Sequence, residues 1–503
     1  MTTPPGSPSA STAGPGTAQA PPDDLPSTLR ELRASGWSDR TVREELRANL
    51  IARLRAGDPL VADVVGFEHS VLPDLERSLL AGHDLILLGE RGQAKTRIVR
   101  RLVELLDEWA PIVAGCELHS SPDRPLTPHA RAQLAEHGDD TPIAWIHRDQ
   151  RFNEKLATPD TAVADLVGDV DPIKVAEGRH LSDEGTIHWG LLPRSNRGLF
   201  AMNELPDLPE RIQVSLLNVL EERDVQVRGY PVRLDLDVVL VATANPDDYT
   251  NRGRIISPLK DRFGSQVRTH YPHTIADEVA IVRQEATPGP AEVAVAVPDF
   301  MDEVVARLTH QLRANDEINQ RSGVSVRFTI GGHETMVAGA VRRAVRLGES
   351  TAVPRIADLW PLVSSAQGRI EFDTLDEGRE EDIVTMALRR AILETWREHL
   401  AGVDVGWLLD RFDVEDFAVV TGSLVGARDL LDQVVGDDTS RPDGLVDAMT
   451  ALGVAAEDPG AAASVLELLL EGLHLGRRLS KDVDAGLGDW LGGDVDGDTV
   501  FTA

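Results

Sequence analysis

Cysteine and long hydrophobic runs are both scarce in this sequence. The chain has 503 residues and a single cysteine, Cys116, which excludes an internal disulfide framework and suits a reducing compartment. No run of about 18 apolar residues occurs, so we expect no membrane-spanning helix. The N-terminus has no basic start followed by an apolar core, so we expect no secretory signal. Together these absences predict a cytoplasmic protein that spans no membrane.

Basic residues are also few relative to acidic ones. The 51 lysines and arginines face 83 aspartates and glutamates, which gives a formal net charge of −32. Such a surface repels nucleic-acid phosphates unless basic residues gather locally, so we expect no nucleic-acid partner. Residues 371–503 hold 30 acidic and 10 basic residues, a net charge of −20, and supply most of the excess. This charge favours solubility and basic partners.

Composition and hydrophobic pattern divide the chain into five expected regions, in line with the two or three domains that its length predicts. Residues 1–27 contain seven prolines among small polar residues and are expected to form a disordered tail. An N-terminal helical segment is expected over 28–58 and an α/β core over 59–273. A helical lid is expected over 274–370, followed by the acidic and mainly helical region 371–503.

Short apolar runs alternate with helical patterns in the expected core. The runs are "DLILLG", "PIVAGC", "GLFAMNE" and "VVLVATAN". This alternation predicts an α/β fold in which a parallel sheet is covered by helices.

The segment Leu85–Leu106, "LILLGERGQAKTRIVRRLVELL", reads as a strand, a glycine loop and a helix. It nearly matches the phosphate-binding pattern G-x-x-x-x-G-K-[ST], but Ala94 stands in place of the second glycine. In such loops backbone N–H groups surround the phosphates, a lysine reaches the β- and γ-phosphates, and a hydroxyl holds Mg²⁺. We expect Ala94 to take helical φ and ψ at the helix start, so that the loop keeps its shape. The alternative is a plain strand-to-helix turn.

These residues predict a site for ATP with Mg²⁺. Lys95 would contact the phosphates, and the Thr96 hydroxyl would hold the metal ion. The expected nucleotide-binding residues are Gly89, Glu90, Arg91, Gly92, Gln93, Ala94, Lys95 and Thr96.

Polar residues at the ends of two later apolar runs predict the catalytic part of the same site. Glu204 can orient and deprotonate water, and Asn203 offers a neutral oxygen that would hold Mg²⁺ more weakly than a carboxylate. Asn245 can hydrogen-bond the γ-phosphate or the attacking water. The alternative for these residues is a buried strand that ends in a polar turn.

Two arginines complete the predicted set of catalytic residues. Arg262 follows "ISPLKD" and could neutralise transition-state charge in a neighbouring subunit. Arg327, in "RSGVSVRFT", is a possible second phosphate sensor. For each, the alternative is an ordinary surface arginine.

The order of these segments resembles the AAA+ ATPases of the helix-2-insert group, especially MoxR-type proteins and the ATPase subunit of magnesium chelatase. "GERGQAKT" is similar to the MoxR loop, which also has alanine before its lysine. "GLLPRSNRGLFAMNELPDL", "TANPDDY" and "PLKDRFG" resemble three chelatase segments. The resemblance covers about residues 60–340.

The resemblance implies a P-loop AAA+ core and roles by position. Gly89 to Thr96 would be the Walker A loop, Asn203 and Glu204 the Walker B pair with Asn203 in place of the usual aspartate, Asn245 sensor 1, Arg262 the arginine finger and Arg327 sensor 2. It also implies an insert over about 150–190 and a hairpin over Val225 to Leu236.

The resemblance implies a ring-forming ATPase, a hexamer by analogy, that assembles or activates a client complex. The sequence has no D-x-S-x-S motif, so a von Willebrand A-domain partner would be a separate chain. One alternative is a magnesium-chelatase ATPase subunit, and another is a nucleotide-gated scaffold with little hydrolysis. An activator of an alternative sigma factor is disfavoured because the G-A-F-T-G-A loop is missing.

Overall fold

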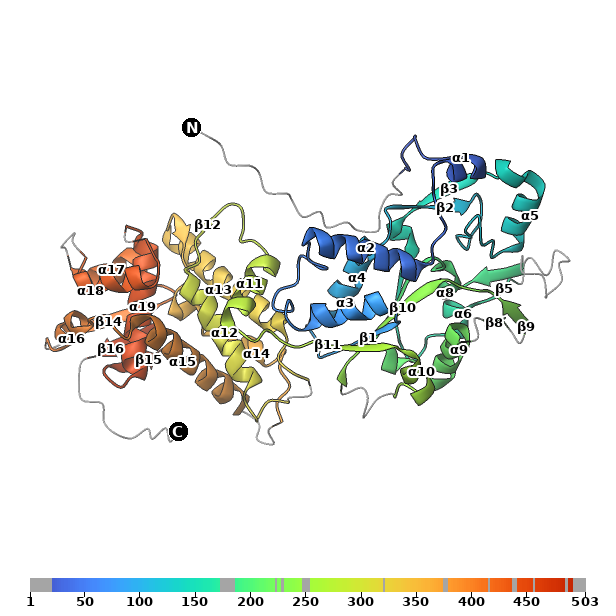
Figure 1. Cartoon of the computed structure of the whole chain (residues 1–503). Helices are drawn as coiled ribbons and strands as arrows, with labels where there is room; N and C mark the ends of the chain where they lie inside the picture. The colour runs from blue at the N-terminus through green and yellow to red at the C-terminus, as the bar shows by residue number, and fades with distance from the viewer. Residues whose placement is uncertain are drawn as a thin grey trace. The chain divides into compact units, whose positions relative to one another are not determined.

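The chain folds into two compact units in the computed structural model (Figure 1). One unit comprises Met1–Gly89 with Ala94–Thr269, and the other comprises Glu90–Gln93 with His270–Ala503. The structure describes residues 20–171, 186–221, 224–227, 230–246, 254–319, 322–373, 379–414, 417–436, 441–455, 457–484 and 487–491. Most of the predicted disordered tail, residues 1–19, therefore lies outside the described residues.

Parallel strands form the central sheet of the first unit, in the order β11–β1–β10–β7–β4. Their bounds are Ser265–Arg268, Leu85–Leu88, Val238–Ala244, Gly198–Asn203 and Phe152–Leu156. Strands β1, β10 and β7 are buried along their whole length. This burial on both faces explains why their sequences are continuous apolar runs.

Helices cover both faces of this sheet (Figure 1). Alternate residues of β1 face opposite sides of the sheet. Leu85 and Leu87 pack in one core with α2, α3 and α4, whereas Ile86 and Leu88 pack in the opposite core with α9 and α10. The bounds of these helices are Val42–Ala56, Val71–Ala81, Lys95–Arg101, Glu210–Glu221 and Ser257–Arg262. The predicted fold class, a parallel sheet flanked by helices, is confirmed.

One of the four apolar runs does not join the parallel sheet. The run "PIVAGC" lies in β2 (Trp109–Val113) and the turn after it, and β2 pairs with β3 (Ile143–His147) in a separate antiparallel sheet. The sequence prediction was wrong here because an apolar run does not specify which strand it pairs with. The remaining edge strand, β4, reads "FNEKL" and is only partly buried, so it gave no hydrophobic signal.

Two short hairpins extend from the core. Strand β5 (Gly168–Val170) pairs with β6 (Ile187–Trp189) in the region of the predicted insert, of which residues 172–185 lie outside the described part. Strand β8 (Asp224–Val227) pairs with β9 (Tyr230–Arg233), so an antiparallel hairpin does occupy the predicted segment.

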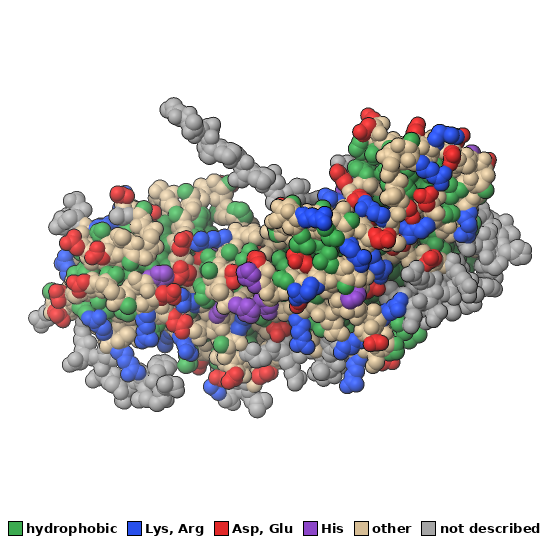
Figure 2. Space-filling view, in the orientation of Figure 1, with side chains coloured by type: hydrophobic (Ala, Val, Ile, Leu, Met, Phe, Trp, Pro, Cys, Tyr) green, Lys and Arg blue, Asp and Glu red, His purple; other side chains and the backbone are tan. Residues whose placement is uncertain are grey.

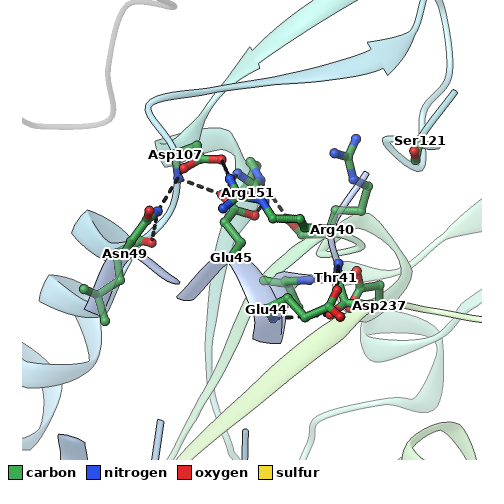
Figure 3. Close-up of polar contacts among 12 residues, drawn as sticks. Arg40, Thr41, Glu44, Glu45, Asn49, Asp107, Ser121, Arg151 and Asp237 are labelled. Atoms are coloured by element: carbon green, nitrogen blue, oxygen red, sulfur yellow. Dashed lines mark hydrogen bonds and ion pairs between the residues drawn. The ribbon is translucent and has the colours of Figure 1, made fainter. Parts of the chain in front are cut away.

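A buried ion pair attaches helix α2 to the core. Glu45 of α2 accepts hydrogen bonds from Nη1 and Nη2 of Arg151, at 2.7 and 2.6 Å, and from the backbone N–H of Asp107 at 2.7 Å. Figure 3 shows the Glu45 and Arg151 side chains facing each other. The helix begins at a capping box of Thr41 and Glu44, which satisfies two of its free N–H groups.

The second unit is mainly helical. Helices α11 to α14 lie within residues 274–370, and helices α15 to α19 lie within residues 371–503. Their bounds are Ile275–Glu285, Asp299–Arg313, Val326–Leu347, Pro361–Ala366, Arg379–Leu400, Gly406–Phe412, Ala427–Val435, Asp443–Ala451 and Pro459–Leu475. One hydrophobic core runs through both groups, from Phe300 to Trp490. Every residue of α19 from Ala461 to Leu473 is buried.

A small antiparallel sheet in the acidic region was not predicted. It has the order β14–β16–β15, with bounds Ala418–Gly422, Leu487–Leu491 and Ser480–Asp484. Among the described residues, no helix is both long and apolar enough to cross a bilayer. Acidic and basic side chains are interspersed on the face shown in Figure 2.

Candidate nucleotide site

The predicted phosphate loop connects β1 to α4. Lys95, the first residue of α4, is buried, and its Nζ donates to the carbonyl oxygen of Gly89 and to Oδ1 of Asn245, the latter at 3.1 Å. Gly89 follows the buried strand β1 directly, so the ammonium group is held at the carboxyl end of the sheet. Thr96, the next residue, is partly buried.

Ala94 adopts a left-handed conformation, with φ of 53° and ψ of 12°. The expectation that it would take helical φ and ψ is therefore wrong. A left-handed alanine costs roughly 1–2 kcal/mol relative to its ordinary conformation. This cost explains why glycine is the usual residue in such loops. The cost is small enough that the loop keeps its turn with alanine. Gly92 also has a positive φ, of 79°.

Glu204 lies directly after β7, at the same edge of the sheet as the loop. Its backbone is left-handed, with φ of 54°, and its N–H donates to Oγ1 of Thr243 at 3.2 Å. Its Oε2 accepts from Nδ2 of Asn245 at 3.3 Å. The structure thus brings Lys95, Asn245 and Glu204 into one hydrogen-bonded series from three neighbouring parallel strands.

Asn203 is buried and holds a different set of partners. Its Oδ1 accepts from Oγ1 of Thr243 at 3.2 Å, and its Nδ2 donates to Oε1 of Glu154. Glu154 lies on β4, the strand beside β7, and also accepts from Nε of Arg100 at 2.8 Å. A carboxylate therefore lies next to the amide that replaces the usual acidic residue.

Sequence reasoning missed Glu154 because its strand has no hydrophobic signal. The only signal in the sequence is an acidic residue within a short polar segment. Acidic residues in such segments are too common to identify a site. Its proximity to Asn203 follows from the parallel pairing of β4 with β7, where Glu154 stands opposite Ala201.

The donor set fits a magnesium ion bound together with a nucleotide. Mg²⁺ prefers oxygen ligands, and in such sites it is bound by one or two side chains, phosphate oxygens and waters. Thr96, Asn203 and the two neighbouring carboxylates Glu204 and Glu154 supply oxygens of this kind. Within the described ranges, no group of three or more His, Cys, Asp or Glu side chains could hold a metal ion alone.

The two predicted arginines lie in different units. Arg262 is the last residue of α10 in the first unit and is exposed. Arg327 is near the start of α13 in the second unit and is also exposed. The loop residues Glu90–Gln93 group with the second unit as well, and there the N–H of Glu90 donates to Oε1 of Gln93 at 3.0 Å.

Curated relatives are similar to this chain over part of its length. The magnesium-chelatase 38 kDa subunit of Cereibacter sphaeroides is 29% identical over 210 residues, which cover 39% of this chain and 54% of that protein. Magnesium-chelatase subunit ChlI of Anabaena variabilis is 29% identical over 212 residues, covering 40% and 57%. The chain is similar to these magnesium-chelatase subunits over about two fifths of its length. It spans about half the length of the curated relatives it matches.

A family model and solved structures are also similar to this chain. The family described as "Sigma-54 interaction domain" matches residues 181–260, the segment that contains β7, Glu204 and Asn245. Among solved structures, a complex of subunits BchI and BchD of magnesium chelatase is matched with 20% identity over 65% of this chain and 98% of that chain, at a TM-score of 0.33. The Thermotoga maritima RuvB branch migration motor is matched with 13% identity over 88% of each chain, at a TM-score of 0.32. Because these TM-scores are low, the fold assignment rests on the sheet described above.

Proposed function

We propose that this AAA+ chain binds ATP with Mg²⁺ at the phosphate loop and hydrolyses it. The observation that carries the proposal is the hydrogen-bonded series of Lys95, Asn245 and Glu204. Ligands of open α/β sheets bind at the carboxyl ends of the strands, and these three residues lie at that edge. They supply a cation, an amide and a carboxylate, which are the groups that phosphoryl transfer to water requires.

Each residue has a distinct role in the proposed reaction. The Lys95 ammonium binds the terminal phosphates, and Asn245 positions the carboxylate of Glu204 by donating to it. Glu204 orients the attacking water and accepts its proton. Thr96 and Asn203 would hold Mg²⁺, which when bound neutralises charge on the phosphates.

We also propose how the chain assembles and what kind of partner it acts on. The exposed Arg262 would complete the site of an adjacent subunit, which supports a ring, a hexamer by analogy. Arg327 would act as the second sensor. We favour a MoxR-like remodeller in the cytoplasm that acts on a separate partner, such as a von Willebrand A-domain chain or another client protein. A chelatase subunit is the second candidate, because the curated relatives carry that name. An activator of sigma-54 is not favoured, since the sequence has no G-A-F-T-G-A loop.

Phosphate release from the purified chain with Mg-ATP tests the proposal. Turnover per chain should rise with protein concentration, because Arg262 acts between subunits, and should vanish in Lys95→Ala together with ATP binding. ATP binding without turnover at any concentration would support the nucleotide-gated scaffold. Absence of ATP binding by the folded wild-type chain would refute the proposed function.

Glu154 is expected to supply the negative charge that Asn203 lacks. Replacing Glu154 with glutamine should raise the Mg²⁺ concentration for half-maximal phosphate release by about tenfold to a hundredfold, the usual effect of losing a partner of a metal ligand. The double variant Asn203→Asp/Glu154→Gln moves the charge by one strand and should recover most of the loss. The single variant Asn203→Asp places two carboxylates in contact, so its apparent affinity for Mg²⁺ should be lower than that of the double variant.

The matched control for Glu154 is Glu117→Gln, which removes an exposed carboxylate that pairs with Arg194. It should leave the Mg²⁺ dependence at the wild-type value. If Glu154→Gln shows that same value, Glu154 has only a structural role beside Arg100.

A further inference from the structure

A cavity of about 770 Å³ lies within the second unit. Its walls come from α13, α14 and the 3₁₀ turn η7 (Ile356–Asp358), and from α15, α19 and strands β14 to β16 of the acidic region. This volume lies in the range of about 300–1,000 Å³ that is usual for small-molecule pockets. None of its described lining residues belongs to the phosphate loop or to the Glu204 series. The cavity is therefore separate from the proposed nucleotide site.

One wall of the cavity is aromatic and held in place. The Lys481 ammonium lies 5.4 Å from the ring centroid of Trp360 and 4.6 Å from that of Trp490. Trp490 is 1% exposed, and its Nε1 donates to Oγ1 of Thr421 at 3.0 Å. Trp360 is only partly buried, so it offers a flat apolar surface to the cavity.

Buried carboxylates on the wall are each compensated by a cation of the chain. The pairs are Asp358 with Arg343 at 2.5 Å, Glu467 with Arg355 at 3.3 Å and Glu471 with Lys481 at 2.6 Å. Burial raises the pKa of the Asp358 carboxyl against the effect of Arg343, which can only make this wall less negative. The interior therefore has little negative charge left to repel an anion.

Two lining arginines have no such partner. Arg342 of α13 and Arg389 of α15 are exposed, and no described residue forms an ion pair or hydrogen bond with either guanidinium. Thr385 lies one turn before Arg389 and also lines the cavity. In a chain of net charge −32, these two unpaired arginines leave positive charge beside the cavity that an anion could pair with.

We propose that this cavity binds a small organic anion, a carboxylate or phosphate with a flat apolar body. The body would lie against Trp360, and the anionic group would bind Arg342 and Arg389. Such a ligand would contact the expected lid and the acidic region at once. The proposal stands independently of the ATPase activity.

The test uses anilinonaphthalene sulfonate, a flat apolar anion whose fluorescence rises in apolar sites, titrated into the full chain. One saturable site per chain is expected. The variant Arg342→Gln/Arg389→Gln should weaken binding about tenfold or more, because charge-assisted hydrogen bonds are lost. The uncharged analogue phenylnaphthylamine should bind wild type and this variant equally weakly.

The matched control is Arg346→Gln/Arg397→Gln, which removes the same charge from exposed positions outside the cavity on the same two helices, α13 and α15. It should bind the probe like the wild type. Thr385→Phe provides a second test, since it keeps both arginines and narrows the cavity beside Arg389, so it should weaken binding of the probe. Circular dichroism spectra that match the wild type confirm that each variant is folded.

Three results would overturn the proposal. The first is equal affinity of the wild type and the Arg342/Arg389 variant for the probe. The second is an affinity of Thr385→Phe for the probe that equals the wild-type affinity. The third is displacement of the probe by ATP in the wild type but not in Lys95→Ala, which would locate the probe at the phosphate loop.

Discussion

Replacing Glu204 with glutamine is expected to lower phosphate release by about 10²–10⁴-fold while ATP still binds, because the variant loses the group that accepts a proton from water. Glutamine keeps the size of the side chain and an oxygen that can still accept from Nδ2 of Asn245. It also keeps Lys95 in its place, so the phosphates still have their cation. The measurement is steady-state phosphate release beside equilibrium binding of a fluorescent ATP analogue.

The control for this prediction is Glu210→Gln, which changes an exposed carboxylate at the start of α9. It should retain wild-type turnover. A Glu204→Gln variant that still releases phosphate at the wild-type rate would mean that another group accepts the proton, and the role assigned to Glu204 would be wrong. Loss of ATP binding in Glu204→Gln would instead indicate that the side chain holds the loop in place.

Replacing Glu45 with alanine is expected to lower the free energy of unfolding of the first unit by about 3–5 kcal/mol, the usual cost of leaving a buried charge unpaired. Arg151 has a side chain that is 1% exposed, so removing Glu45 leaves a buried guanidinium without its carboxylate partner. The backbone N–H of Asp107 loses its acceptor as well. Urea unfolding followed by circular dichroism measures the effect, and the transition that contains the first unit should shift.

A double variant separates the pair from its surroundings. Glu45→Met/Arg151→Met removes both charges and should be more stable than Glu45→Ala alone, since no uncompensated ion remains. Asp140→Asn, which breaks an exposed pair with Arg30, should leave the transition where it is. If Glu45→Ala behaves like Asp140→Asn, the buried pair does not hold α2 to the core.

Local sequence was enough to predict the elements whose pattern is self-contained. Strands β1, β7 and β10 are buried on both faces, so each appears as an unbroken apolar run. The phosphate loop is a contiguous motif, and its lysine and threonine can be recognised without knowing their neighbours. Helical periodicity likewise predicted the character of residues 274–370 and most of 371–503.

The candidate site was only partly predictable, for a reason that Asn203 illustrates. Its identity as a neutral residue in place of an acidic one is plain from the sequence. Whether a carboxylate compensates for it depends on which strand lies beside β7, and the polar strand β4 gave no sign of that role. The left-handed backbone of Ala94 was also missed, because alanine has no sequence signal for a positive φ.

The sequence alone therefore determined the α/β class, the glycine loop between a strand and a helix, the ends of two strands that carry Glu204 and Asn245, and the mainly helical character of the rest. Tertiary structure alone decided that β2 leaves the parallel sheet, that Glu154 contacts Asn203, that Glu45 pairs with Arg151 across 106 positions and that Arg342 and Arg389 line one cavity. The physical reason is the same in each case. Periodicity and motifs report the preferences of a segment for its own backbone shape and burial, whereas these contacts depend on strand order and on packing between residues far apart in the chain.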